Sequence, residues 1–167
     1  GRLQIDLSSA VEEGLVDLVE ALILDGADVH ATGTWGAAAF SRIGFPPVPQ
    51  PTADQWWVKE PPRVMRGSLL FCSAFLNHRA VLRLLLDKKV AVDTVGCFVG
   101  DGIRREGTAL WVAAALGHAG VAQDLVARGA DTTVLGKEIC PSAAGFGEAV
   151  GFSTPLWCAA YHNRSEE

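Results

Sequence analysis

One sequence template recurs along this chain, and the recurrence restricts the possible folds more than any other feature. The clearest copies are GTALWVAAALGH at 107–118 and STPLWCAAYHNR at 153–164, and a degraded copy, GSLLFCSAFLNH, lies at 67–78. In each copy a leucine lies seven residues before a glycine or an asparagine, and the same step joins Leu7 to Gly14. The sequence therefore predicts four similar units in a row.

Apolar residues within each unit recur with a helical period rather than with the alternation of a half-buried strand. Val121 and Leu125, for example, follow the glycine step of the third unit four residues apart. The small pair Ala113 and Ala114 stands in a column that allows neighbouring helices to approach closely. Gly129 falls just past the second helix, where a residue with positive φ ends a helix at low steric cost. Each unit is therefore predicted to be a helical hairpin.

These residues resemble the ankyrin repeat, whose elements T-P-L-H-x-A-A, G-H and L-L-x-x-G-A-D are matched most fully at 107–131. The resemblance covers about half of the chain. It implies an all-α fold, an ankyrin-type helix-loop-helix solenoid with three complete hairpins, a partial fourth and extended inter-repeat loops. It also implies a family whose members mostly bind other proteins.

The chain departs from the family pattern at the histidine that follows the leucine of the template. Phe71, Trp111 and Trp157 occupy this position, so the hydrogen bond that the family histidine makes to the turn threonine cannot form. We expect an aromatic ring packed between repeats in its place.

The whole chain, 1–167, is predicted to form a single repeat domain. Its parts are repeat 1 at about 3–31, an insertion at 32–66, repeat 2 at 67–93, a loop at 94–106, repeat 3 at 107–131, a loop at 132–152 and partial repeat 4 at 153–167. The family period is about 33 residues, so the extra residues are expected to lie in loops between the units. All of these loops should lie on one edge of the solenoid, where family members commonly engage partners.

Aromatic and basic side chains in these loops are the candidate partner-binding residues, because Trp and Arg dominate binding hot spots. They are Trp35, Trp56, Trp57, Arg63 and Arg66 in the insertion, and Phe98, Arg104 and Arg105 in the next loop. We expect the loops to form one continuous recognition surface. The alternative is that the aromatic residues of the insertion fold back onto the solenoid and merely bury the loop.

Composition and motifs argue against several function classes. The formal net charge of −5 leaves no concentrated basic face for nucleic acid. No stretch predicts a membrane span, and no residues stand at the spacing of a metal site or a catalytic constellation. We therefore expect no nucleic acid, no membrane, no metal, no cofactor and no enzymatic activity.

Four cysteines are present without a CxxC pair: Cys72, Cys97, Cys140 and Cys158. Free thiols in a reducing compartment are the favoured interpretation, which predicts a cytoplasmic or nuclear protein. Cys97 and Cys140 lie in successive loops, however, and could approach one another.

The function expected from these observations is a non-enzymatic protein–protein interaction module that binds through the loop edge and the concave face. One alternative is a substrate-recruiting arm of a larger enzyme or ubiquitin-ligase complex, and another is a structural spacer with no direct ligand. The fourth unit ends near its second helix, and a repeat unit cannot bury its face alone. Missing repeats or a partner are therefore expected to cap the C-terminal end.

Overall fold

The computed structural model describes residues 2–44, 63–100, 103–141 and 148–164. The helices in these ranges are α1 (Arg2–Glu13), α2 (Val16–Leu24), α3 (Ala37–Arg42), α4 (Leu69–Phe75), α5 (Arg79–Asp87), α6 (Ala109–Ala115), α7 (Ala119–Ala127) and α8 (Pro155–Arg164). The strands are β1 (Thr32–Trp35), β2 (Val64–Ser68), β3 (Gly96–Gly100), β4 (Ile103–Gly107), β5 (Gly136–Pro141) and β6 (Glu148–Ser153). No helix in the described ranges is both long and apolar enough to cross a membrane.

Helix pairs lie where the repeated template predicted them. The pairs α1–α2, α4–α5 and α6–α7 are each joined by a tight turn, and the residue at the turn has positive φ: Gly14 at 73°, Asn77 at 60° and Gly117 at 74°. This conformation suits glycine and is tolerated by asparagine. The seven-residue step from the leucine thus marks the turn at which each first helix ends.

The prediction of an all-α solenoid with loop connections is wrong. The connections form strands, which pair in the order β1-β2-β3-β4-β5-β6 as one antiparallel sheet. Residues 94–106 and 132–152, predicted as loops, contain the hairpins β3–β4 and β5–β6, and the insertion contributes β1, α3 and β2. Stacking of the helix pairs brings successive connections side by side, where pairing satisfies their backbone N–H and C=O groups.

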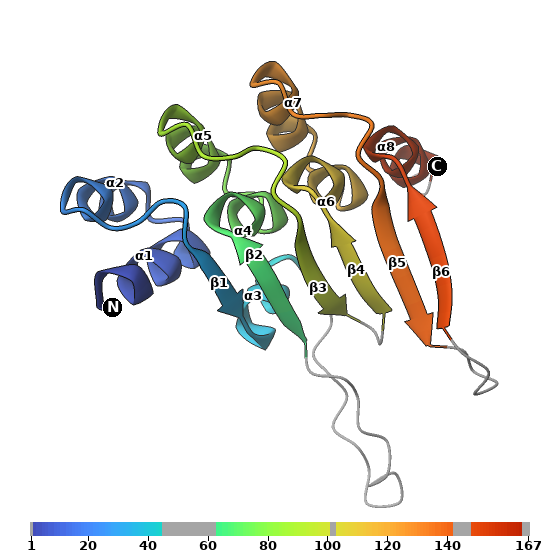
Figure 1. Ribbon diagram of the computed structural model, residues 1–167, viewed down its shortest axis with the longest axis horizontal. Coiled ribbons are helices and arrows are strands. Elements are labelled where there is room, and N and C mark those ends of the chain that lie inside the picture. The colour runs from blue at the N-terminus through green and yellow to red at the C-terminus, as the bar shows by residue number, and fades with distance from the viewer. Residues whose placement is uncertain (1, 45–62, 101–102, 142–147, 165–167) are drawn as a thin grey trace, which may run out of the picture.

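The helices lie in two rows along one end of the sheet (Figure 1). We call α1, α4, α6 and α8 the inner row and α2, α5 and α7 the outer row. The strands run away from the inner row (Figure 1). Residues of the sheet and of α6 and α8 border a common cavity, and we call the space between the sheet and the inner row the concave groove. The core is continuous along the stack and includes Leu7, Leu70 and Leu110, which are 0%, 1% and 3% exposed.

A Ser or Thr at the end of a strand, or directly after it, precedes each inner helix from α4 onward. Side-chain oxygens of Ser68, Thr108 and Thr154 accept hydrogen bonds from the backbone N–H three residues later, at 3.1, 3.2 and 3.1 Å. Such N-caps contribute about 1 kcal/mol each. The third residue is an aromatic in every case, so the cap also fixes the backbone from which Phe71 and Trp111 project.

A row of glycines beside these corners makes room for the aromatic rings. The row consists of Gly33, Gly67, Gly96, Gly107 and Gly136. A Cβ atom added to Gly96 would lie 2.6 Å from the ring of Phe71, and one added to Gly136 would lie 2.1 Å from the indole of Trp111. Close packing of this kind leaves no volume for a side chain. Phe71 and Trp111, two of the aromatic residues at the family's histidine position, therefore pack directly against the sheet.

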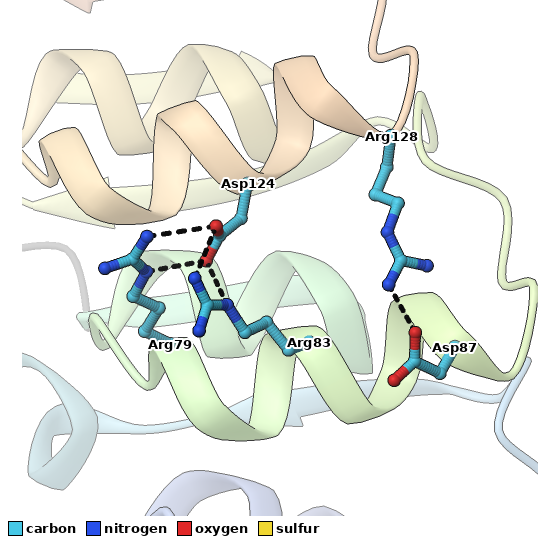
Figure 2. A network of polar contacts seen from close by, with 5 residues as sticks. All are labelled: Arg79, Arg83, Asp87, Asp124 and Arg128. Atoms are coloured by element: carbon cyan, nitrogen blue, oxygen red, sulfur yellow. Dashed lines mark hydrogen bonds and ion pairs between the residues drawn. The ribbon is translucent and has the colours of Figure 1, made fainter.

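Ion pairs join the outer helices of successive units (Figure 2). Arg79 and Arg83 of α5 each donate two hydrogen bonds to the carboxylate of Asp124 in α7, at 2.6 to 3.0 Å. Hydrogen bonds from the two guanidinium groups hold the pKa of Asp124 well below its usual range. Arg128 also pairs with Asp87. Several basic residues of the second unit are thus occupied within the stack.

Histidines at the helix turns join the inner helices. Nε2 of His78 lies 3.0 Å from the carbonyl oxygen of Glu12, and Nε2 of His118 lies 3.2 Å from that of Phe75. Each histidine contacts the last turn of the preceding inner helix, where carbonyl groups lack partners within the helix. These contacts give both histidines a structural role between successive units.

Candidate functional site

One row of side chains across the sheet faces the concave groove. Paired residues place Trp35, Met65, Phe98, Arg105 and Glu138 in register from β1 to β5. The row faces the inner helices, because the ring of Phe98 lies 5.1 Å from that of Phe75 at the end of α4. The row therefore forms the floor of the groove, and the ends of the inner helices form its wall.

In the N-terminal half of the groove, the short helix α3 fills the space. Phe40 of α3 is fully buried, with its ring 5.1 Å from that of Phe75 and 6.4 Å from that of Phe98. Ala39 beside it is also fully buried, and Arg42 at the end of α3 pairs with Glu13 of α1. This half is closed by the chain itself.

In the C-terminal half, the same groove opens into a cavity of about 470 Å³. Its lining includes Phe98, Arg105, Ala115, Glu138, Trp157 and Tyr161. A volume of this size falls within the range of sites that enclose a ligand or an inserted side chain. The cavity lies between the sheet and the ends of α6 and α8, one unit further along than Phe40.

A shift of forty residues relates the two halves, as it relates Leu70 to Leu110. Applied to the surroundings of Phe40, it replaces Phe75 by Ala115, Met65 by Arg105 and Phe98 by Glu138. The first replacement removes a ring from the wall, and the other two place charges on the floor. These replacements remove volume and add charge in the half of the groove that the described residues leave open.

Arg105 and Glu138 form an ion pair on the floor of the cavity. Nε of Arg105 donates to Oε1 of Glu138 at 2.9 Å, and the guanidinium carbon lies 5.6 Å from the ring centre of Phe98. The Arg105 side chain is 20% exposed and that of Glu138 is 42% exposed. The pair is thus held in place, with polar groups that an incoming molecule can reach.

Helix α8 presents apolar side chains that are buried at the equivalent positions of the other units. Leu156 is 77% exposed, whereas Leu110 in the same column is 3% exposed. Trp157 is 58% exposed against 1% for Trp111, and its ring stacks on that of Tyr161 at 5.3 Å. Exposed apolar surface of this extent is a feature of interaction sites.

The predicted partner-binding residues divide between the core, the two faces of the sheet and the undescribed segment. Trp35 and Phe98 are buried, so these two aromatics pack within the chain, and Trp35 Nε1 donates to the carbonyl oxygen of Ser8 at 3.4 Å. Arg63 is also buried, at 8% exposure. Trp56 and Trp57 lie outside the described residues.

The three remaining arginines lie on different faces of the sheet. Arg105 lines the concave cavity, whereas Arg66 and Arg104 are exposed on the opposite face. There they border a hollow of about 490 Å³ together with Cys97, and Arg104 pairs with Glu106. The sheet therefore separates residues that were predicted to form one continuous surface.

Sequence reasoning missed Ala115, Glu138, Trp157 and Tyr161 as candidate site residues. Trp157 was assigned to the interior because Trp111 shares its column, and Tyr161 was counted only as part of the template. A signal was present in the forty-residue shift, which makes Arg105 the equivalent of Met65 and Glu138 the equivalent of Phe98 in the preceding unit. Charged residues at positions that are apolar in the preceding unit mark a change of environment.

The thiols offer no nucleophile at the cavity. All four cysteines are free, and Cys158 lines the cavity wall. Burial raises the pKa of the Cys158 thiol, and burial also raises the pKa of Cys72. A raised pKa keeps these groups in the unreactive thiol form at neutral pH. Among the described residues, no group of three or more His, Cys, Asp or Glu side chains could hold a metal ion.

Comparison with protein-family models finds no match to this chain, and comparison with curated proteins finds no relative.

Proposed function

We propose that this chain is a non-enzymatic protein–protein interaction module that binds its partner in the C-terminal half of the concave groove. The observation that carries the proposal is the joint exposure of Trp157 and Tyr161 beside a cavity of about 470 Å³. Large aromatic side chains contribute much of the energy of protein interfaces, because they bury a large rigid surface at small entropic cost. An apolar wall above a reachable ion pair supplies both affinity and orientation.

The hollow on the opposite face of the sheet is the weaker candidate. Polar residues such as Thr32 and Thr34 surround Arg66 and Arg104 there, and no aromatic side chain of the described residues lines the hollow. Arg104 already has a carboxylate partner in Glu106. Exposed ion pairs of this kind contribute little to binding.

The proposal keeps the resemblance to ankyrin repeats for the helix pairs alone, since their turn positions and leucine columns follow the template. It assigns no cofactor and no catalytic residue to the chain. An intracellular location, cytoplasmic or nuclear, is part of it, because four unpaired thiols suit a reducing compartment.

Site-specific photo-crosslinking tests the proposal. The photoreactive residue p-benzoylphenylalanine is placed at Tyr161, which lies in the groove, or at Arg104, which lies on the opposite face. In cells, we expect a discrete protein adduct from position 161 and none from position 104. Adducts from position 104 alone would move the interaction to the other face, and adducts from neither would leave the chain as a structural spacer.

A further inference from the structure

Helix α3 is an occupant of the groove that the chain supplies to itself. Two neighbouring side chains, Ala39 and Phe40, are fully buried, while Ala37 and Ala38 are exposed. Arg42 reaches out of the groove to pair with Glu13. Ile43, directly after α3, also packs against the core. The segment thus occupies the groove with one small residue and one aromatic anchor on a short helical backbone.

The place that Phe40 fills is the first seat, and the cavity in the next unit is the second seat. The second seat has the equivalent position but a different lining. Ala115 stands where Phe75 contacts the anchor, and Phe98 borders both places. Trp157, which occupies the template position of Trp111, and Tyr161 supply aromatic surface on the α8 side of the cavity. Apolar surface for a ring is therefore present on two sides of the cavity.

Polar groups set the second seat apart. Arg105 and Glu138 replace the apolar residues Met65 and Phe98 on the floor. A phenylalanine inserted here would cover part of a charged pair without replacing its hydration, and such desolvation is unfavourable. A tyrosine ring fits the same walls, and its hydroxyl can donate to the carboxylate of Glu138 or accept from the guanidinium of Arg105.

We propose that the cavity between β3–β5 and the ends of α6 and α8 binds a short helical segment of a partner protein, seated as α3 is, with a tyrosine as its anchor. This inference rests on the proposed function and names the chemistry of the partner. The segment carries a small residue next to the tyrosine, as Ala39 precedes Phe40, because the helix backbone must lie close to the sheet. Recognition then follows the helix-in-groove mode with a single deep anchor.

A set of three peptides tests the anchor. The first has the sequence of residues 36–44, GAAAFSRIG, and the others carry Tyr or Ala in place of the phenylalanine. Binding is followed by NMR at the indole N–H of Trp157, assigned with the variant Trp157→Phe. We expect saturable shifts with the tyrosine peptide, roughly fivefold weaker binding of the phenylalanine peptide, in line with one hydrogen bond, and no saturable shift with the alanine peptide.

Three variants of the chain test where the peptide binds and what its tyrosine contacts. Ala115→Phe introduces the residue found at the equivalent position of the filled half and should abolish binding of the tyrosine peptide. Arg104→Ala changes the opposite face of the sheet and should leave binding unchanged. The third variant, Glu138→Gln combined with Arg105→Leu, should retain ring binding but erase the preference for tyrosine over phenylalanine, so the inference stays testable if Ala115→Phe does not fold.

Absence of saturable shifts with the tyrosine peptide, or equal shifts with the alanine peptide, would overturn the inference. A preference for tyrosine over phenylalanine that persists in the variant with both Glu138→Gln and Arg105→Leu would also overturn the inference. If none of the peptides binds while crosslinks from position 161 are still formed, the proposal of a tyrosine-anchored helix is wrong and the proposed interaction module stands. If both fail, the proposed function fails as well.

Discussion

The two halves of the concave groove are lined by equivalent positions of successive units, but one half is filled and the other is open. In the N-terminal half, Phe40 from α3 is fully buried against Phe75 and Phe98. In the C-terminal half, a cavity of about 470 Å³ lies at the equivalent place, and Tyr161 on its wall is 65% exposed. The difference teaches that a few side chains decide whether such a groove is completed by its own chain or remains available to another.

The chemistry of the lining follows the state of each half. An aromatic ring supplied by the chain meets apolar neighbours, which suits permanent burial. The open half carries the Arg105–Glu138 pair, whose groups stay partly hydrated. Charges on a floor that is to be covered only part of the time keep the uncovered surface compatible with water.

The largest effect is expected from removal of the ring that closes the N-terminal half. Phe40→Ala should lower the free energy of unfolding by about 3 kcal/mol, because it empties a fully buried aromatic site. Urea unfolding followed by circular dichroism measures the change. The matched variant Tyr161→Ala in the open half should stay within about 0.5 kcal/mol of the wild type. Equal losses from both variants would remove the distinction between the halves.

A smaller effect is expected at the glycine row of the sheet, which makes room for the rings of Phe71 and Trp111. Gly136→Ala places a Cβ atom 2.1 Å from the buried indole of Trp111 and should cost about 2 kcal/mol through overpacking. Gly151 on the neighbouring strand has open space at its Cβ position, so Gly151→Ala is the control and should change stability little. Thermal unfolding of the two variants gives the comparison, and an unaffected Gly136→Ala protein would show that the ring is not held against the sheet.

Asp124 joins the outer helix of the closed half to that of the open half, since α5 and α7 belong to successive units. Asp124→Asn should lower stability by about 1 kcal/mol at neutral pH, because two guanidinium groups lose their carboxylate partner. The pKa of Asp124 is depressed in the folded chain, so this contribution is full above the unfolded pKa near 4 and is lost as the pH falls further.

Unfolding curves of wild type and Asp124→Asn, recorded from pH 7 down to pH 2, test the expected sign. Their difference should be constant near neutrality and should shrink below about pH 4. A difference that grows on acidification would mean that Asp124 stabilises the stack in some way other than as a charged acceptor.

The smallest effect on stability is expected from filling the open half. Ala115→Phe copies the side chain found at the equivalent wall position and should change the free energy of unfolding by less than about 1 kcal/mol, with stabilisation the favoured direction. Calorimetry measures this. A loss of several kcal/mol would show that the wall has no room and that the cavity is not the counterpart of the Phe40 seat.

The sequence predicted the helix pairs well, because their signal is local. A leucine seven residues before Gly14, Asn77 or Gly117 marks both the buried face and the turn. The strands escaped prediction because their evidence lies in pairing between distant segments. β3 reads GCFVG and β4 reads IRREG, and glycine within such short runs lowers any local strand signal.

The candidate site was predicted in part, through Phe98 and Arg105, which both line the cavity. Trp35 and Phe98 were chosen for their aromatic side chains, and the structure places both in the core. No pattern in one unit distinguishes an aromatic residue that packs inward from one that faces a partner. Trp111 and Trp157 make this plain, since the same template position is 1% exposed in one unit and 58% exposed in the other.

Hydroxyl-radical footprinting of Phe40 and Tyr161 tests the contrast between the halves most directly. Oxidation of each residue is measured by mass spectrometry in the native chain and divided by its rate in the urea-unfolded chain, which removes the intrinsic difference between the two side chains. We expect strong protection of Phe40 and almost none of Tyr161, as their burial indicates. Similar protection of the two residues would contradict a groove that is closed in one half and open in the other.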